Sequence, residues 1–271
     1  MNEIVYTAEP ALRHPGRFLA GVGEELRRSL SVAWPLFRAN LQARHRRAWL
    51  GYLWLLVPTV ATTLVWMYVQ SRRIVGVAPT GLPYPLFVLS GMIFWQVFVD
   101  ALNAPLAQLS AGRQLITRNH VPPKALLVAS GLEVIVNCAV RLVVLAALML
   151  FLRVAPGANI FLLPLAIAAL ATFGLALGIA AAPLGMLFDD VGRAIGVVTG
   201  FWFFLTPVLY PARGVMRFNP LTPLVGTARN WLTGGAADDG FAPVLALSIP
   251  LLAAAWFFQR LARPHVVARL G

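Results

Sequence analysis

The strongest constraint on this chain is a series of long apolar segments, each long enough to cross a lipid bilayer. An α-helix rises 1.5 Å per residue, so about 20 apolar residues span a hydrocarbon core of about 30 Å. Such segments cover residues 50–70, 86–108, 125–152, 159–186, 194–210 and 241–259. Only 12% of the residues are charged and 59% are hydrophobic, whereas a soluble domain carries about 25% charged residues. The sequence therefore predicts an all-α integral membrane protein with six transmembrane helices.

Basic residues are distributed unevenly between the two sides of the predicted spans. The net charge is +12, and most of the basic residues lie in residues 1–49, 109–124 and 260–271. Cytoplasmic loops of membrane proteins carry an excess of Lys and Arg, so we expect both termini in the cytoplasm. The expected organisation is a cytoplasmic N-terminal segment (1–49), a transmembrane domain (50–259) and a cytoplasmic tail (260–271).

The N-terminal segment contains a pattern typical of a helix that lies on a membrane surface. In residues 26–41 large apolar side chains recur every three or four positions among arginines. They are Leu26, Leu30, Trp34, Phe37 and Leu41. This spacing predicts an amphipathic interface helix on the inner surface. We expect Pro35 to split it, because the residue before a proline disfavours helical backbone.

Residues 211–240, on the predicted outer side, are apolar but interrupted by prolines and by the Gly234-Gly235 pair. Thr222 followed by Pro223 is a favourable helix start. We expect a short, re-entrant helix from there to Trp231.

Three charged residues, Asp100, Glu133 and Arg141, lie within predicted spans, where a charge costs at least about 2.5 kcal/mol near the bilayer centre. Glu133, Asn137 and Arg141 share one face of the third span at intervals of four, and Asp100 of the second span lies about as deep as Glu133. Two interpretations remain open: an ion pair that binds spans two and three together, or a wet channel wall.

Aromatic residues gather at mid-span, where an interfacial belt does not explain them. Phe94, Trp95 and Phe98 lie in the second span, and Phe201, Trp202 and Phe204 in the fifth. Aromatic faces suit the C–H faces of sugars. These six residues are candidates for lining a channel; packing between helices or against lipid is the alternative.

Several motifs, in order along the chain, resemble those of polysaccharide-export ABC permeases. The run RHRRAWLGYLWLLVP at 44–58 is similar to the start of these permeases, which carry O-antigen, capsule or teichoic acid. The similarity continues through LFVLSG at 86–91, LITRNHVP at 115–122, FDDV at 188–191, LTPVLY at 205–210 and Asn219-Pro220. The chain departs from the usual pattern at Ala39-Asn40, His45 and Asp189-Asp190.

The resemblance implies a homodimer of six-helix subunits in the bacterial inner membrane, with a continuous channel between the protomers. It also implies two separate nucleotide-binding ATPase subunits and a polyprenyl-linked polysaccharide as substrate.

The sequence contains no P-loop, because GxxxxGK[ST] requires a lysine and Lys124, the only lysine, follows Pro122-Pro123. We therefore expect no cofactor bound by this chain, with ATP and Mg in the partner ATPase. The cytoplasmic segment after the second span is the candidate for ATPase coupling. It comprises Arg113, Gln114, Leu115, Ile116, Thr117 and Arg118.

Two alternatives to a polysaccharide exporter remain. One is an ABC permease for a drug or a small lipid. The other is a membrane enzyme that acts on polyprenyl phosphate, but such chemistry needs converging carboxylates or histidines. The histidines are scattered, and Asp189-Asp190 is a weak metal candidate. We therefore expect a transport subunit, not an enzyme, with no metal site and no nucleic-acid partner.

Overall fold

The computed structural model describes residues 29–42, 53–72, 81–112 and 121–270, and all regular structure in this part of the chain is helical. Residues 29–42 form the first described helix. The long helices that follow are α2 (Leu53–Ser71), α3 (Tyr84–Ala111), α5 (Pro123–Phe151), α6 (Leu163–Leu187), α7 (Asp190–Leu205) and α9 (Phe241–Leu270). The shorter ones are η2 (Ala158–Leu162), η3 (Gly214–Phe218) and α8 (Leu221–Thr233). The predicted all-α fold is confirmed.

Among the described residues, five helical segments are long and apolar enough to cross a membrane. They are Leu53–Ser71, Tyr84–Ala111, Pro123–Phe151, Ala158–Leu187 and Phe241–Ala262. Each overlaps one of the predicted spans. Helix α9 continues to Leu270, through residues that we assigned to a cytoplasmic tail.

The prediction of six spans is not confirmed, because α7, which overlaps residues 194–210, is shorter than the five membrane-length helices. It begins at Asp190 and has 16 residues, which gives a length of about 24 Å. The helix ends at Leu205 because Thr206, which precedes Pro207, has extended backbone (φ −101°, ψ 137°). Pro207 thus prevents the helix from continuing through the rest of the predicted span.

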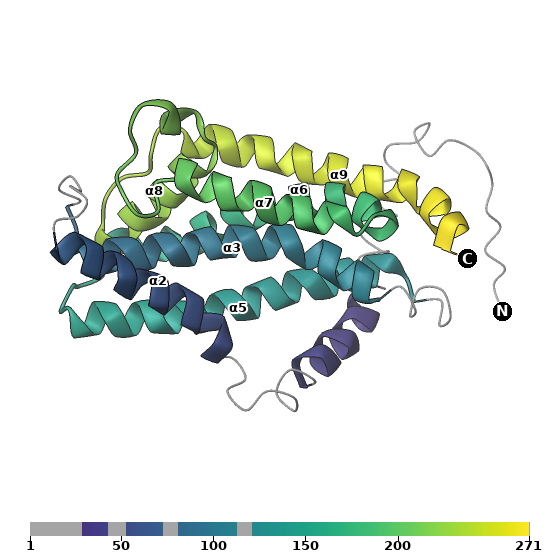
Figure 1. Cartoon of the computed structure of the whole chain (residues 1–271), viewed down its shortest axis with the longest axis horizontal. Coiled ribbons are helices and arrows are strands. Elements are labelled where there is room, and N and C mark those ends of the chain that lie inside the picture. Colours follow the sequence, from purple (N-terminus) through teal and green to yellow (C-terminus); the bar gives the residue numbers. More distant parts are fainter. Residues whose placement is uncertain (1–28, 43–52, 73–80, 113–120, 271) are drawn as a thin grey trace.

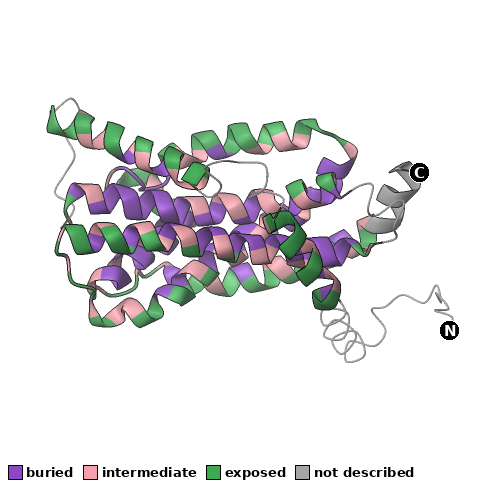
Figure 2. Cartoon of the chain, turned by 90° about the horizontal axis from the view of Figure 1, so that it is seen from below, coloured by how far each residue is buried: buried purple, intermediate pink, exposed green. Residues whose placement is uncertain are grey.

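Helix α3 is the centre of the bundle (Figure 1). It packs most extensively against α6 and α5, and α6 in turn packs against α9. Buried residues concentrate on these central helices, whereas the outer helices are largely exposed (Figure 2). Gly174 and Gly178 permit the α3–α6 contact. A Cβ atom at Gly178 would lie 2.3 Å from the Leu102 carbonyl oxygen, so only glycine allows this approach.

The helix at residues 29–42 lies beside the bundle at the end where α3 finishes and α5 begins (Figure 1). It runs without interruption through Pro35, so the predicted split is wrong. Ala33 and Phe37 are buried and belong to the same apolar cluster as Ala125 and Ala129 of α5. Leu30 and Trp34 remain exposed. The helix therefore has one face packed on α5 and a second apolar face that is uncovered.

Helix α8 lies at the opposite end of the bundle (Figure 1) and packs against α6, η2 and α3. It begins at Leu221, close to the predicted start, and ends at Thr233. Gly234 terminates it in the left-handed conformation (φ 90°), with its N–H donating to the Asn230 carbonyl, as is usual for a glycine after a helix. The short helix is thus confirmed.

Candidate functional site

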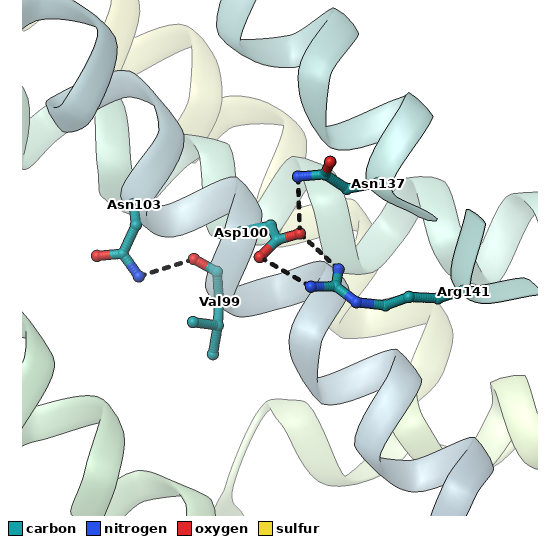
Figure 3. Close-up of polar contacts among 5 residues, drawn as sticks. All are labelled: Val99, Asp100, Asn103, Asn137 and Arg141. Carbon is teal, nitrogen blue, oxygen red and sulfur yellow. Dashed lines mark hydrogen bonds and ion pairs between the residues drawn. The ribbon is translucent and has the colours of Figure 1, made fainter. Parts of the chain in front are cut away.

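Asp100 of α3 and Arg141 of α5 form an ion pair in the middle of two long helices. Arg141 Nη1 donates to Asp100 Oδ2 at 2.5 Å, and Arg141 Nη2 lies 3.4 Å from Oδ1. Asn137, one turn along α5, donates to the same Oδ2 at 3.2 Å (Figure 3). The side chains of Arg141 and Asp100 are 3% and 17% exposed. The structure therefore contains the helix-binding ion pair, which was the first of the two interpretations.

A second polar contact joins the same two helices about two turns away. Gln108 Nε2 of α3 donates to Glu133 Oε2 of α5 at 2.7 Å. Because α3 and α5 run antiparallel, Gln108 lies toward the end of α3 and Glu133 toward the start of α5. The two contacts together fix the register of the α3–α5 pair.

The mid-span aromatic residues of α3 are packed inside the protomer. Phe94 and Phe98 are fully buried and Trp95 is 4% exposed. The Phe98 ring lies 5.3 Å from Trp202 of α7 and 5.9 Å from Phe173 of α6, centroid to centroid. These rings connect α3, α6 and α7 through aromatic contacts. A role for Phe94, Trp95 and Phe98 in lining a channel stays a prediction.

The aromatic residues of α7 divide between two environments. Phe201 and Phe204 are 72% and 56% exposed, on a face that also carries Val197 and Val198. Trp202 is turned inward, and its Nε1 donates to Asn219 Oδ1 at 2.9 Å. The predicted channel residues therefore do not form one continuous wall in this protomer: three lie in its interior, one at the edge and two outside.

Asn219 stabilises the connection between α7 and α8 through its side-chain hydrogen bonds. Its Nδ2 donates to the Leu205 carbonyl at 3.0 Å and to Thr206 Oγ1 at 2.9 Å. Its Oδ1 accepts from Trp202 and also from the backbone N–H of Leu221 at 3.0 Å. The Asn219 side chain thus provides hydrogen-bond partners for backbone groups that have no helical partner where α7 ends and α8 begins.

Arg229 of α8 is buried next to the segment that connects α7 to α8. Its Nη1 and Nη2 donate to the carbonyls of Pro207 and Val208 at 2.6 and 2.7 Å. The guanidinium lies over the Phe87 ring, 3.7 Å from its centroid. Gly91 leaves room for it, since a Cβ there would lie 1.9 Å from Arg229 Nη2. The Arg229 side chain therefore links α3 to the non-helical residues that follow α7.

The turn between α8 and α9 contains a partly buried carboxylate, Asp238. Its Oδ1 accepts a hydrogen bond from Asn230 Nδ2 at 3.1 Å, and its backbone N–H donates to Thr227 Oγ1. Burial raises the pKa of the Asp238 carboxyl above its ordinary value; the bond from Asn230 opposes this shift, and the nearby charge of Asp239 adds to it.

The six residues predicted to couple to an ATPase, Arg113 to Arg118, lie outside the described residues, immediately after Gly112, which follows α3. Within the described ranges, no group of three or more His, Cys, Asp or Glu side chains could hold a metal. Asp190 of the acidic pair bonds the exposed Arg193 at 2.9 Å.

Two of the polar contacts use residues that the sequence did not single out. Gln108 marks only the end of a predicted span, and Arg229 lies in the short helix expected after Thr222, with no role assigned to it. Arginine followed by asparagine in an otherwise apolar helix was the available signal for Arg229, because a basic residue that cannot reach water needs internal partners.

Comparison with known proteins gives consistent relatives, although no family model matches the chain. The O-antigen export system permease protein RfbA of Myxococcus xanthus is 28% identical over 203 residues, which cover 70% of this chain and 75% of that protein. The polysialic acid transport protein KpsM of Escherichia coli is 20% identical over 76% of this chain and 82% of its own length. The capsule polysaccharide export inner-membrane protein CtrC of Neisseria meningitidis is 24% identical over 68% of this chain and 66% of its own length.

The chain thus combines a bundle of membrane-length helices with similarity to proteins named for polysaccharide export and transport. The chain is a homologue of the permease subunits of polysaccharide-export ABC transporters, as its motifs predicted.

Proposed function

We propose that this chain is the channel-forming subunit of an ATP-driven exporter that moves a lipid-linked polysaccharide across the bacterial inner membrane. The observation that carries the proposal is the agreement of three polysaccharide-transport relatives, each aligned over at least two thirds of this chain. None of these three relatives is named as a permease for a drug or a small lipid, which was the alternative. For the alternative of a membrane enzyme, the described residues offer no group of three or more His, Cys, Asp or Glu side chains that could hold a metal.

The transporter is proposed to contain two copies of this chain. Helix α2 supports this, since only Thr59 and Thr63 of its 19 residues are buried. The exposed side of α7, with Phe201 and Phe204, is also uncovered. Facing copies would bring such surfaces around a central path, where aromatic faces can contact sugar rings while hydroxyl groups stay hydrated.

ATP and Mg are proposed to bind a separate nucleotide-binding subunit, of which the complex has two copies. Arg113 to Arg118 would receive its movement, since they directly follow α3 and α3 contacts most of the bundle. Leu115 and Ile116 supply apolar contact between basic residues. Leu115→Asp and Ile116→Asp should therefore weaken association with the ATPase.

Both termini are proposed to lie in the cytoplasm, and the region of α8 outside, as a re-entrant segment. Ala236 is exposed in the turn after α8, and Cys138, the only cysteine, is buried. In a Cys138→Ala background, a cysteine introduced at Ala236 should react with an impermeant thiol reagent added from outside. Reaction only after the membrane is broken would reverse the orientation.

Deletion of the gene in its own host tests the function. The exporter proposal expects loss of polysaccharide from the cell surface, with accumulation of lipid-linked polymer inside the cell. Absence of the polymer from both places would instead indicate an enzyme of polymer synthesis. An unchanged surface polysaccharide would contradict the proposal.

A further inference from the structure

Two hydrogen bonds in series join three helices at the end of the bundle where α3 finishes. Asn40 Nδ2, in the helix at residues 29–42, donates to Gln108 Oε1 of α3 at 3.1 Å. Gln108 Nε2 then donates to Glu133 Oε2 of α5 at 2.7 Å. We call Asn40, Gln108 and Glu133 the amide relay. A single amide side chain thus connects α3 to a neighbour on each side.

The direction of the relay follows from the chemistry of its members. An ionised carboxylate only accepts hydrogen bonds, whereas a primary amide has one oxygen that accepts and one NH₂ that donates. Glu133 therefore takes the NH₂ group of Gln108 and turns its oxygen toward Asn40. Asn40 must then donate. The orientation of all three side chains is determined by the position of one carboxylate.

The relay adds a directional contact to the apolar packing of the N-terminal helix. Ala33 and Phe37 of the N-terminal helix pack with Ala125 and Ala129 of α5, and apolar contact of this kind allows small rotations and shifts. A hydrogen bond weakens steeply with distance and angle. The Asn40–Gln108 bond therefore restricts how the helix at residues 29–42 can turn relative to α3.

Gln108 lies about one turn before Ala111, the last residue of α3, which is a rise of about 4.5 Å. A helix transmits a displacement of its end over such a distance. Further along the same seam, the Asp100–Arg141 ion pair binds α3 to α5 again. A displacement of the end of α3 would therefore also displace α5 and the N-terminal helix.

We propose that Gln108 is a positioning residue for energy coupling, which makes the end of α3, the start of α5 and the helix at residues 29–42 move as one unit. The inference rests on the proposed function, in which an ATPase acts on residues 113–118. It assigns to the N-terminal helix a part in transmitting that movement, in addition to contact with the membrane surface.

Three variants separate the relay from general packing. Gln108→Leu removes both hydrogen bonds. The exchange Gln108→Glu with Glu133→Gln restores them, since the new glutamine can donate to the new carboxylate, whose second oxygen still accepts from Asn40. Asn103→Leu is the matched control: its amide also lies on α3 but donates within that helix, to the Val99 carbonyl at 2.9 Å (Figure 3).

The first measurement uses the full chain in lipid nanodiscs without an ATPase. Spin labels replace the exposed residues Arg38 and Ala107 in a Cys138→Ala background, diluted with unlabelled chain, and their distance distribution is recorded. Gln108→Leu should broaden or shift the distribution. Asn103→Leu and the exchange should resemble the parent. An unchanged distribution in Gln108→Leu would overturn the relay, whatever the chain transports.

The second measurement uses the complex with its ATPase in proteoliposomes, and compares polymer exported with ATP hydrolysed. Gln108→Leu should keep complex assembly and ATP hydrolysis but export about fivefold less polymer per ATP, the effect expected from one or two lost hydrogen bonds. The exchange should recover most of this ratio. Export per ATP equal to that of Asn103→Leu would remove Gln108 from coupling. No export by the parent complex would refute the proposed function, while the spin-label distances would still test the relay.

Discussion

Arg141 on α5 and Asp100 on α3 form an ion pair at 2.5 Å in the middle of the bundle, with Asn137 donating to the same carboxylate. Both charges lie on helices long and apolar enough to cross a membrane. Each charge is tolerated there because the other neutralises it, so the pair fixes α3 and α5 against each other.

Loss of one partner should therefore destabilise the protein strongly. Arg141→Met leaves the Asp100 carboxylate buried without its cation, which in soluble proteins costs about 3–5 kcal/mol. We expect a clearly lower midpoint of thermal unfolding in detergent. Arg193→Met is the control, because the Arg193–Asp190 pair is exposed to solvent. Equal midpoints for the two variants would show that the buried pair does not stabilise the bundle.

Gly91 should tolerate no side chain, because Arg229 occupies the space. A Cβ atom there would lie 1.9 Å from Arg229 Nη2 and 2.7 Å from the Val208 carbonyl oxygen. We expect Gly91→Ala to displace the guanidinium and lower the unfolding midpoint. Gly131→Ala on α5 meets no atom within 4 Å, so it should be neutral or stabilising, because alanine favours helix over glycine by about 1 kcal/mol. Similar midpoints for both variants would refute this account of the Arg229 site.

Asp238 should make stability depend on pH in the direction opposite to that of most carboxylates. Burial raises the pKa of its carboxyl in the folded state, so the folded protein binds this proton more tightly than the unfolded chain does. The stabilisation is present below the unfolded pKa and is lost as pH rises through the raised folded pKa. The midpoint of thermal unfolding of Asp238→Asn, measured relative to that of the parent, should therefore increase as the pH is raised from pH 4 to pH 7. A constant difference across that range would contradict the assignment.

The aromatic residues should separate into a structural and a transport class. Phe98 is fully buried against Trp202 and Phe173, so Phe98→Ala should cost about 3–5 kcal/mol of stability by analogy with soluble cores. Phe201→Ala and Phe204→Ala alter exposed rings and should leave the unfolding midpoint nearly unchanged but slow polymer export. Export by both α7 variants at the parent rate would remove this face from the channel.

Hydropathy and local signals predicted the elements well but not how they face one another. A run of 20 apolar residues determines that a helix crosses the membrane, and Thr206-Pro207 carried the signal that ends α7. Depth along a span placed Asp100 near Glu133, whereas the structure pairs Asp100 with Arg141, about two turns further along α5. Depth alone could not show that Phe94 faces the interior and Phe201 the outside, because lipid and protein interiors accept the same apolar side chains.

Contacts between distant segments were harder to predict than the spans. Gln108 and Asn40 are separated by 68 residues, and no periodicity in either segment indicates the other. Arg229 gains its partners only because Pro207 breaks α7 and exposes two carbonyls to it. Such contacts depend on helix register and rotation, which the order of apolar and polar residues does not encode.

Reconstitution tests the central claim most directly. The chain and its ATPase, purified together, would be placed in proteoliposomes with a defined lipid-linked polysaccharide on the side that carries the ATPase. We predict ATP-dependent appearance of the polymer on the opposite side, with none when ATP is replaced by a non-hydrolysable analogue. ATP hydrolysis without any movement of polymer, or equal movement without ATP, would contradict the account of this chain as the membrane subunit of an ATP-driven polysaccharide exporter.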